Sequence, residues 1–182
     1  MPERPLALFV TLSAFANRLH GDERGTVDRQ HNSHGEPTLG RNDARLGFES
    51  NILSAPPMHF TTLLRSAIES AIQEACDFRD WQLLACHCRT NHVHAVIGTD
   101  AERDEVIARL KDRCTRRLRT AKLIAANQPL WARGGSARYL WTETDIENAC
   151  EYTMNAQGDL IPGTKLWNER HQSEARPEGR AR

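Results

Sequence analysis

The stretch that decides the fold is WQLLACHCRTNHVHAVIG, residues 81–98. It holds two runs of strand length, 81–88 and 92–98, which are joined by the short connection at 89–91. Two such runs separated by so few residues are typical of a β-hairpin. We therefore expect an antiparallel pair of strands at the centre of the chain, and the other elements can be placed around it.

Outward from the hairpin, apolar spacing predicts strands and helices in alternation. Strand-like runs lie at 6–15, 130–133 and 138–141, and helical spacing marks 60–78, 102–123 and 145–155, the last begun by Thr144 and stopped by Gly158. The order strand, helix, strand, strand, helix, strand, helix predicts an α+β fold. We expect a ferredoxin-like (RRM-like) antiparallel sheet with helices on one face.

The length of 182 residues is that of about one domain. We predict a single domain over residues 1–165. Residues from about 20 to 57 are rich in Gly, Asp, Arg, Asn and His and lack apolar periodicity, so they are interpreted as a long N-terminal insertion loop. Residues 166–182 are interpreted as a polar, disordered tail.

Composition excludes several classes of protein. Lys plus Arg equals Asp plus Glu, 24 each, which excludes a basic coat over the whole chain but not a local basic face. No run approaches the ~20 apolar residues of a membrane span, and the first residues lack the apolar region of a signal peptide. The odd number of cysteines, five, favours reduced thiols in a cytoplasmic protein.

His92 and His94 share one face of the second hairpin strand, because side chains alternate along a strand. Two imidazoles on one face can chelate a divalent metal. Cys86 and Cys88 offer an alternative, a Cys₂His₂ zinc set. If Thr90 and the next residue form a two-residue turn, His87 lies opposite His94 and both cysteines lie on the core face, which argues against zinc. A change of one residue in the turn would reverse this conclusion.

The chain has two tyrosines. Tyr139 lies in a strand-like segment and is expected to pack. Tyr152 lies on the last helix, off its most buried line, and is therefore free to face a cleft. A phenol with a pKa of ~10 is a poor nucleophile, and it attacks a phosphodiester only where a metal polarises the phosphorus. A two-histidine metal site beside a tyrosine meets that requirement.

His92-Val93-His94 followed by Tyr152 resembles the single-tyrosine HUH transposases, the insertion-sequence-200-like and REP-associated tyrosine transposases. The segments TNHVHAV at 90–96 and EYTMNAQG at 151–158 resemble them too, and the likeness covers most of residues 5–165. The resemblance implies a ferredoxin-like fold and Mg²⁺ or Mn²⁺ held by the two histidines. It also implies cleavage of single-stranded DNA by Tyr152 through a 5′-phosphotyrosine, in DNA transposition, and either a monomer or a homodimer.

Members of that family often carry a third metal ligand one helical turn after the tyrosine. Here that position is Ala156, which cannot bind a metal. Asn155 and Gln157 flank it, and Gln157 is taken as the third ligand. This departure leaves a second reading open: a weak or inactive module of the same fold that binds single-stranded DNA or RNA, a domesticated transposase.

Residues 109–122 form a basic run with two readings, a phosphate-binding face or an ordinary solvated helix face. Its basic members are Arg109, Lys111, Arg113, Arg116, Arg117, Arg119 and Lys122. Arg133 and Arg138 flank two glycines and could clamp a DNA hairpin, with Trp131 or Trp141 stacking on a base or packing in the core. In the first loop, His20, Asp22, Glu23 and Arg24 could bind DNA or serve as a scaffold.

Overall fold

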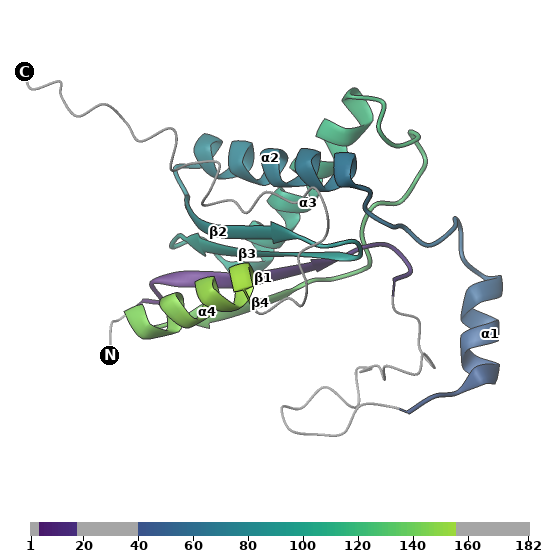
Figure 1. Cartoon of the computed structure of the whole chain (residues 1–182), viewed down its shortest axis with the longest axis horizontal. Helices are drawn as coiled ribbons and strands as arrows, with labels where there is room; N and C mark the ends of the chain where they lie inside the picture. Colours follow the sequence, from purple (N-terminus) through teal and green to yellow (C-terminus); the bar gives the residue numbers. More distant parts are fainter. Residues whose placement is uncertain (1–3, 18–39, 156–182) are drawn as a thin grey trace, which may run out of the picture.

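A computed structural model gives the fold for residues 4–17 and 40–155 (Figure 1). Four strands form one antiparallel sheet in the order β2-β3-β1-β4. The elements in chain order are β1 (Ala7–Ser13), α1 (Asp43–Asn51), α2 (Thr62–Phe78), β2 (Gln82–Cys88), β3 (His92–Gly98), α3 (Arg103–Thr120), β4 (Ser136–Leu140) and α4 (Glu143–Asn155). The prediction of an α+β, ferredoxin-like antiparallel sheet is confirmed.

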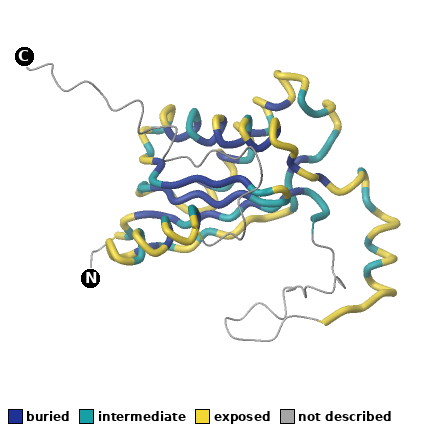
Figure 2. The backbone as a smooth tube through the Cα atoms, in the orientation of Figure 1, coloured by how far each residue is buried: buried dark blue, intermediate teal, exposed yellow. Residues whose placement is uncertain are grey.

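The larger core lies between one face of the sheet and helices α2 and α3. Leu8, Val10 and Leu12 alternate along β1 and point to this face, where they are almost fully buried. Both helices present apolar stripes to it; in α3 the stripe is Val106, Leu110, Cys114 and Leu118, as the sequence predicted. Figure 2 shows this layer as the dark blue strands and the dark blue inner side of α2.

Helix α4 lies on the other face of the sheet (Figure 1), so the expectation of helices on one face holds for α2 and α3 only. A second, smaller apolar cluster, made of Ala7, Ala85, Val96, Leu140 and Ala149, joins α4 to the strands. The physical reason is that the strands are apolar on both faces at their centre, and a sheet face that is apolar needs a cover. One face of the sheet is therefore covered by α2 and α3, and the other, which we call the α4 face, is covered by α4.

The β2–β3 hairpin closes as predicted, with Thr90 and Asn91 in the turn and His87 opposite His94. A β-bulge between Leu83 and Ala85 shifts the register further along. Because a bulge moves every following side chain to the other face, Leu83 and Cys86 both reach the larger core. His87 consequently points to the α4 face.

Smaller predictions were wrong at element boundaries. Helix α1 lies inside the segment interpreted as a loop, begins at the Asn42 cap and buries none of its residues. The strand expected at 130–133 is a single bridge between Ala14 and Trp131. Helix α4 begins two residues earlier than predicted, because the Thr142 hydroxyl, rather than that of Thr144, accepts from the Asp145 amide.

Within the described ranges, no helix is both long enough and apolar enough to cross a membrane. The domain limits, residues 1–165 with a tail at 166–182, stay a prediction. Residues 18–39 and everything beyond residue 155 lie outside the description, and with them most of the predicted loop and the whole predicted tail.

Candidate metal and nucleophile site

The two histidines of the predicted metal pair lie side by side at the start of β3. Both point to the α4 face, opposite to Val93, which is buried in the larger core. The ring centroids of His92 and His94 are 4.7 Å apart. The alternation of β3 therefore presents the pair as a chelating unit, as the sequence predicted.

Hydrogen bonds orient both rings through the same nitrogen. His92 Nδ1 lies 2.6 Å from the side-chain oxygen of Asn91, and His94 Nδ1 lies 2.8 Å from the hydroxyl of Thr11, its register partner on β1. The His94 ring also stacks on Phe9, with centroids 5.1 Å apart. A histidine bonded through Nδ1 binds a metal through Nε2, which is the usual arrangement around metal-binding histidines.

Burial keeps the inner histidine neutral. Desolvation lowers the pKa of His94 to about 4, and the neighbouring His92 and His87 add to the effect. At neutral pH the ring is therefore uncharged, the state in which imidazole binds metal ions. Among residues 4–17 and 40–155, no group of three His, Cys, Asp or Glu side chains is placed to hold a metal, so the pair stands without a third such ligand there.

Tyr152 brings its ring to the same place from α4. Its centroid is 5.6 Å from that of His94 and 5.9 Å from that of Phe9, both in edge-on geometry. The side chain is 46% exposed, whereas Ala149 and Thr153 on the neighbouring stripe are buried. The phenol ring thus lies beside the histidine pair at the surface of the molecule, as the sequence predicted for a residue off the buried line.

Arg138 completes the described site. It lies on β4 opposite Phe9, and its guanidinium carbon is 5.9 Å from the centroid of the Phe9 ring. Because Phe9 also contacts His94 and Tyr152, one aromatic side chain links all three. A cation is therefore held on the same sheet face as the histidines and the tyrosine.

A comparison with models of known protein families finds a match to this part of the chain. The family model described as "Transposase IS200 like" matches residues 58–155, which include both histidines, Tyr152 and Arg138 and make up more than half of the chain. The chain belongs to the family of IS200-like transposases. No match to the curated proteins is found.

One solved structure similar to this family member is that of a REP-associated tyrosine transposase bound to a REP hairpin. The two chains are 11% identical, with a TM-score of 0.45. The match covers 83% of this chain and 66% of the other, so this IS200-like chain spans just under two thirds of the length of that relative.

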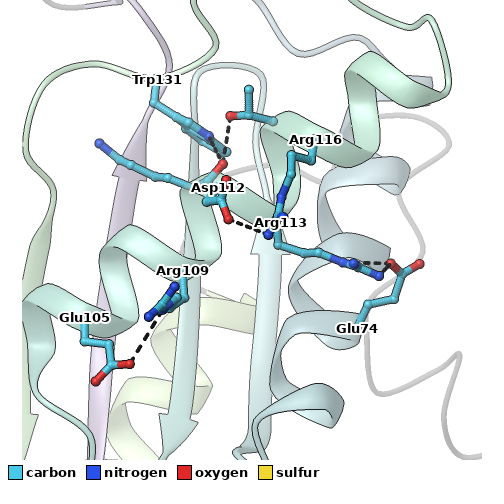
Figure 3. Close-up of polar contacts among 9 residues, drawn as sticks. Glu74, Glu105, Arg109, Asp112, Arg113, Arg116 and Trp131 are labelled. Carbon is cyan, nitrogen blue, oxygen red and sulfur yellow. Dashed lines mark hydrogen bonds and ion pairs between the residues drawn. The ribbon is translucent and has the colours of Figure 1, made fainter.

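The predicted arginine face of α3 lies away from the site. Arg109, Arg113, Arg116 and Arg117 point outward from α3, the helix that covers the opposite face of the sheet, and Figure 3 shows the first three with acidic partners. The ion pairs are Arg109–Glu105 at 3.6 Å, Arg113–Glu74 at 2.5 Å, Arg116–Asp112 at 2.5 Å and Arg117–Glu74 at 3.6 Å. The structure therefore does not bring these arginines together with Tyr152, and their binding of DNA stays a prediction.

Arg133 is exposed in the loop before β4, where Gly134 adopts a positive φ of 68°. Lys111, counted in the sequence among the phosphate-binding cations, instead holds this loop. Its ammonium group donates to the backbone carbonyl oxygen of Ala132 at 2.7 Å and to that of Gly134. Partial burial lowers the pKa of Lys111, which is consistent with a structural role.

Of the two tryptophans considered for stacking on a base, Trp131 is structural and Trp141 lies at the surface. Trp131 packs edge-on against Phe60, with centroids 5.5 Å apart, and donates from Nε1 to the carbonyl of Lys111 at 3.3 Å (Figure 3). It is partly buried and packs against the larger core. Trp141 is 39% exposed and lines a pocket of about 430 Å³ together with Tyr139. Tyr139 donates to Glu102 on the α3 side, as expected of a packed tyrosine.

The zinc alternative is wrong. Cys86 and Cys88 are buried in the larger core, on the face of the sheet opposite to His92 and His94. Burial, with a further contribution from Glu69, raises the pKa of both thiols, as expected of cysteines in an apolar core. All five cysteines are free.

We therefore expect that chelation will not unfold this protein. EDTA should shift the thermal midpoint of the purified chain by less than about 2 °C, because the described core is apolar and holds no zinc set. Differential scanning calorimetry with and without EDTA measures this. A fall of the thermal midpoint by about ten degrees or more would show that a bound metal stabilises the fold.

Several predicted residues lie outside the described part of the chain. They are Gln157, chosen as third metal ligand, Ala156 beside it, and the loop residues His20, Asp22, Glu23 and Arg24. Sequence reasoning in turn missed Phe9 and Thr11, which contact His94. Their alternation along β1 was readable, but only the pairing of β1 with β3 shows which residues of β3 they meet.

Proposed function

We propose that this chain is a transposase that cleaves and rejoins single-stranded DNA, with Tyr152 as the nucleophile and a divalent ion, Mg²⁺ or Mn²⁺, as cofactor. The observation that carries the proposal is the contact of the Tyr152 ring with His94, at 5.6 Å between centroids, on a face that also holds His92. Membership of the IS200-like transposase family supports it.

The residues present fit a divalent ion. His92 and His94 would hold it through their Nε2 atoms, since both Nδ1 atoms are engaged with Asn91 and Thr11. Gln157 remains the candidate for a third ligand. When bound, the ion would withdraw charge from a phosphodiester group and make its phosphorus susceptible to attack.

The chain itself would supply the nucleophile of the reaction. The Tyr152 oxygen would attack the phosphorus and lose its proton to solvent, forming a bond to the 5′ phosphate. The bond from phosphorus to the 3′ oxygen breaks, and that oxygen takes up a proton to leave as a 3′-hydroxyl. Attack of another 3′-hydroxyl on the phosphotyrosine reverses these steps and rejoins DNA without an external energy source.

The fold supplies the orientation. Phe9 stacks on the His94 ring and packs edge-on against the Tyr152 ring, so the distance between nucleophile and ligand depends on packing within the fold. Arg138, whose guanidinium lies over Phe9, is the described cation best placed to meet a DNA phosphate at this site. Arg133 could extend that contact along the strand.

The experiment that tests the proposal uses end-labelled single-stranded hairpin DNA with the full chain and Mn²⁺. A covalent adduct that resists denaturing electrophoresis, and disappears when EDTA replaces Mn²⁺, is the expected result. Binding of the DNA without any adduct under a range of divalent ions would contradict it. That outcome would favour the alternative, a non-catalytic single-strand-binding module, which the alanine at position 156 keeps open.

Arg138→Ala should weaken binding of single-stranded DNA and flatten its salt dependence. Loss of one phosphate contact lowers the slope of log K against log salt by about 0.7 on a single strand. The matched variant is Arg116→Ala, which lies on α3 and is already paired with Asp112, so its effect should be smaller. Fluorescence anisotropy at several salt concentrations measures both. An equal effect of the two variants would place DNA on α3 as well.

A further inference from the structure

His87 is a buried histidine to which neither the sequence nor the proposed reaction gives a role. It lies on β2 directly opposite His94 of β3, on the α4 face, and is 1% exposed. A polar ring so deeply buried costs free energy unless its nitrogens are bonded. Its contacts therefore indicate why this position carries a histidine.

The ring is bonded to the helix that carries the tyrosine. His87 Nδ1 lies 3.1 Å from the backbone carbonyl oxygen of Thr153, which accepts the hydrogen bond. The bond joins β2 to α4 directly beside the candidate nucleophile, because Thr153 follows Tyr152 on that helix. His87 thus provides α4 with a hydrogen-bond donor from the sheet.

This bond is one residue away from Tyr152. Thr153 is fully buried, and its hydroxyl donates to the carbonyl of Ala149 within the same helix. The preceding residue, Tyr152, then projects toward His94 and Phe9. His87 and His94 are cross-strand partners. The first is hydrogen-bonded to α4, and the second belongs to the candidate metal pair.

The second ring nitrogen, Nε2, bears on whether His87 anchors the helix or binds a metal. His87 Nε2 is buried and has no hydrogen-bond partner among the described residues. Because burial lowers the pKa of His87, the ring stays neutral, with its proton on Nδ1 as the bond to Thr153 requires. The three histidines are not arranged as a three-ligand metal site in the described residues, so helix anchoring is the contact that explains His87.

We propose that His87 is a positioning residue, which holds α4 against the sheet at Thr153 so that Tyr152 lies beside the histidine pair. The inference deepens the proposed function and rests on it for its consequence in catalysis. Its structural part, the coupling of His87 to the placement of Tyr152, does not depend on DNA or metal.

The test compares His87→Leu with His87→Asn in the full chain. Leucine fills similar space without a donor, whereas the asparagine amide occupies about the place of Nδ1 and can donate to Thr153. At saturating DNA and Mn²⁺, His87→Leu should slow adduct formation about 10- to 100-fold, since misplacement by about 1 Å costs that much. His87→Asn should recover most of the rate, and the Kd for Mn²⁺ should stay unchanged in both.

A second readout needs neither DNA nor metal. Nuclear Overhauser contacts between the rings of Tyr152 and His94 should be present in the wild type and in His87→Asn and be lost in His87→Leu. Intact ring contacts in a folded His87→Leu would overturn the inference. So would equal rates for the leucine and asparagine variants.

His87→Gln separates anchoring from metal binding, because its amide reaches about the place of Nε2. If His87→Leu and His87→Asn both lose Mn²⁺ affinity and His87→Gln restores it, His87 is a metal ligand and the positioning role is overturned. If the wild type forms no adduct with any divalent ion, the proposed function fails. The ring contacts then still decide the inference.

Discussion

Replacing Tyr152 by phenylalanine should abolish the covalent protein–DNA adduct. The variant lacks only the phenol oxygen, so the rate of adduct formation should fall by more than about 10³-fold, as expected when a nucleophile is removed. The ring contacts with His94 and Phe9 do not need the hydroxyl. The variant should therefore stay folded, and its DNA affinity should stay close to that of the wild type.

The chain offers a matched control for this variant in Tyr139, its other tyrosine. Tyr139 donates to Glu102 on the far face of the sheet, so Tyr139→Phe should form the adduct at the wild-type rate. Denaturing electrophoresis with labelled DNA, followed by peptide mapping of the adduct, measures both variants. An adduct that survives Tyr152→Phe, or that maps to another residue, would refute the assignment.

The second large effect is expected from His94→Asn. Asparagine can keep a contact with the Thr11 hydroxyl but has no atom at the position of Nε2, so it removes a metal ligand with little loss of local bonding. Loss of an outer partner alone typically costs about 10- to 100-fold in metal affinity, so loss of a ligand should cost at least about 100-fold. Adduct formation should fall with it.

Isothermal titration with Mn²⁺ measures the affinity directly, and His59→Ala is the control, because His59 is an exposed histidine outside the sheet. We expect His59→Ala to bind Mn²⁺ as the wild type does. Unchanged Mn²⁺ affinity in His94→Asn would show that the ion is held elsewhere. Adduct formation by that variant at low Mn²⁺ concentration would lead to the same conclusion.

Much of the fold followed from patterns along the chain. The spacing of apolar residues in α2 and α3, and the two runs of the hairpin, depend on local geometry, so they are legible without tertiary contacts. Alternation on β3 likewise places His92 and His94 on one face. The two-residue turn at Thr90 and Asn91 was enough to predict that His87 lies opposite His94 and that the cysteines point into the core.

Other features were beyond any local pattern. The composition of α4 does not tell which face of the sheet it covers. Its apolar residues pack in the second cluster, around Ala85 and Val96, and that cluster exists only once the strands are assembled. The acidic partners of the α3 arginines come partly from α2, through Glu74, so the sequence overstated the free positive charge of that helix. The contact of Thr11 with His94 likewise depends on how β1 pairs with β3.

The amino-acid sequence by itself determined most of the sheet strands and the helices α2, α3 and α4, the shared face of the histidine pair and the surface position of Tyr152, because each depends on spacing within one element. Only the tertiary structure decided that Tyr152 contacts His94, that Arg138 lies over the adjoining Phe9, that the α3 arginines lie elsewhere, and that His87 is bonded to α4. These arrangements join residues far apart in the chain, and their distances are set by strand register and by the face on which a helix packs.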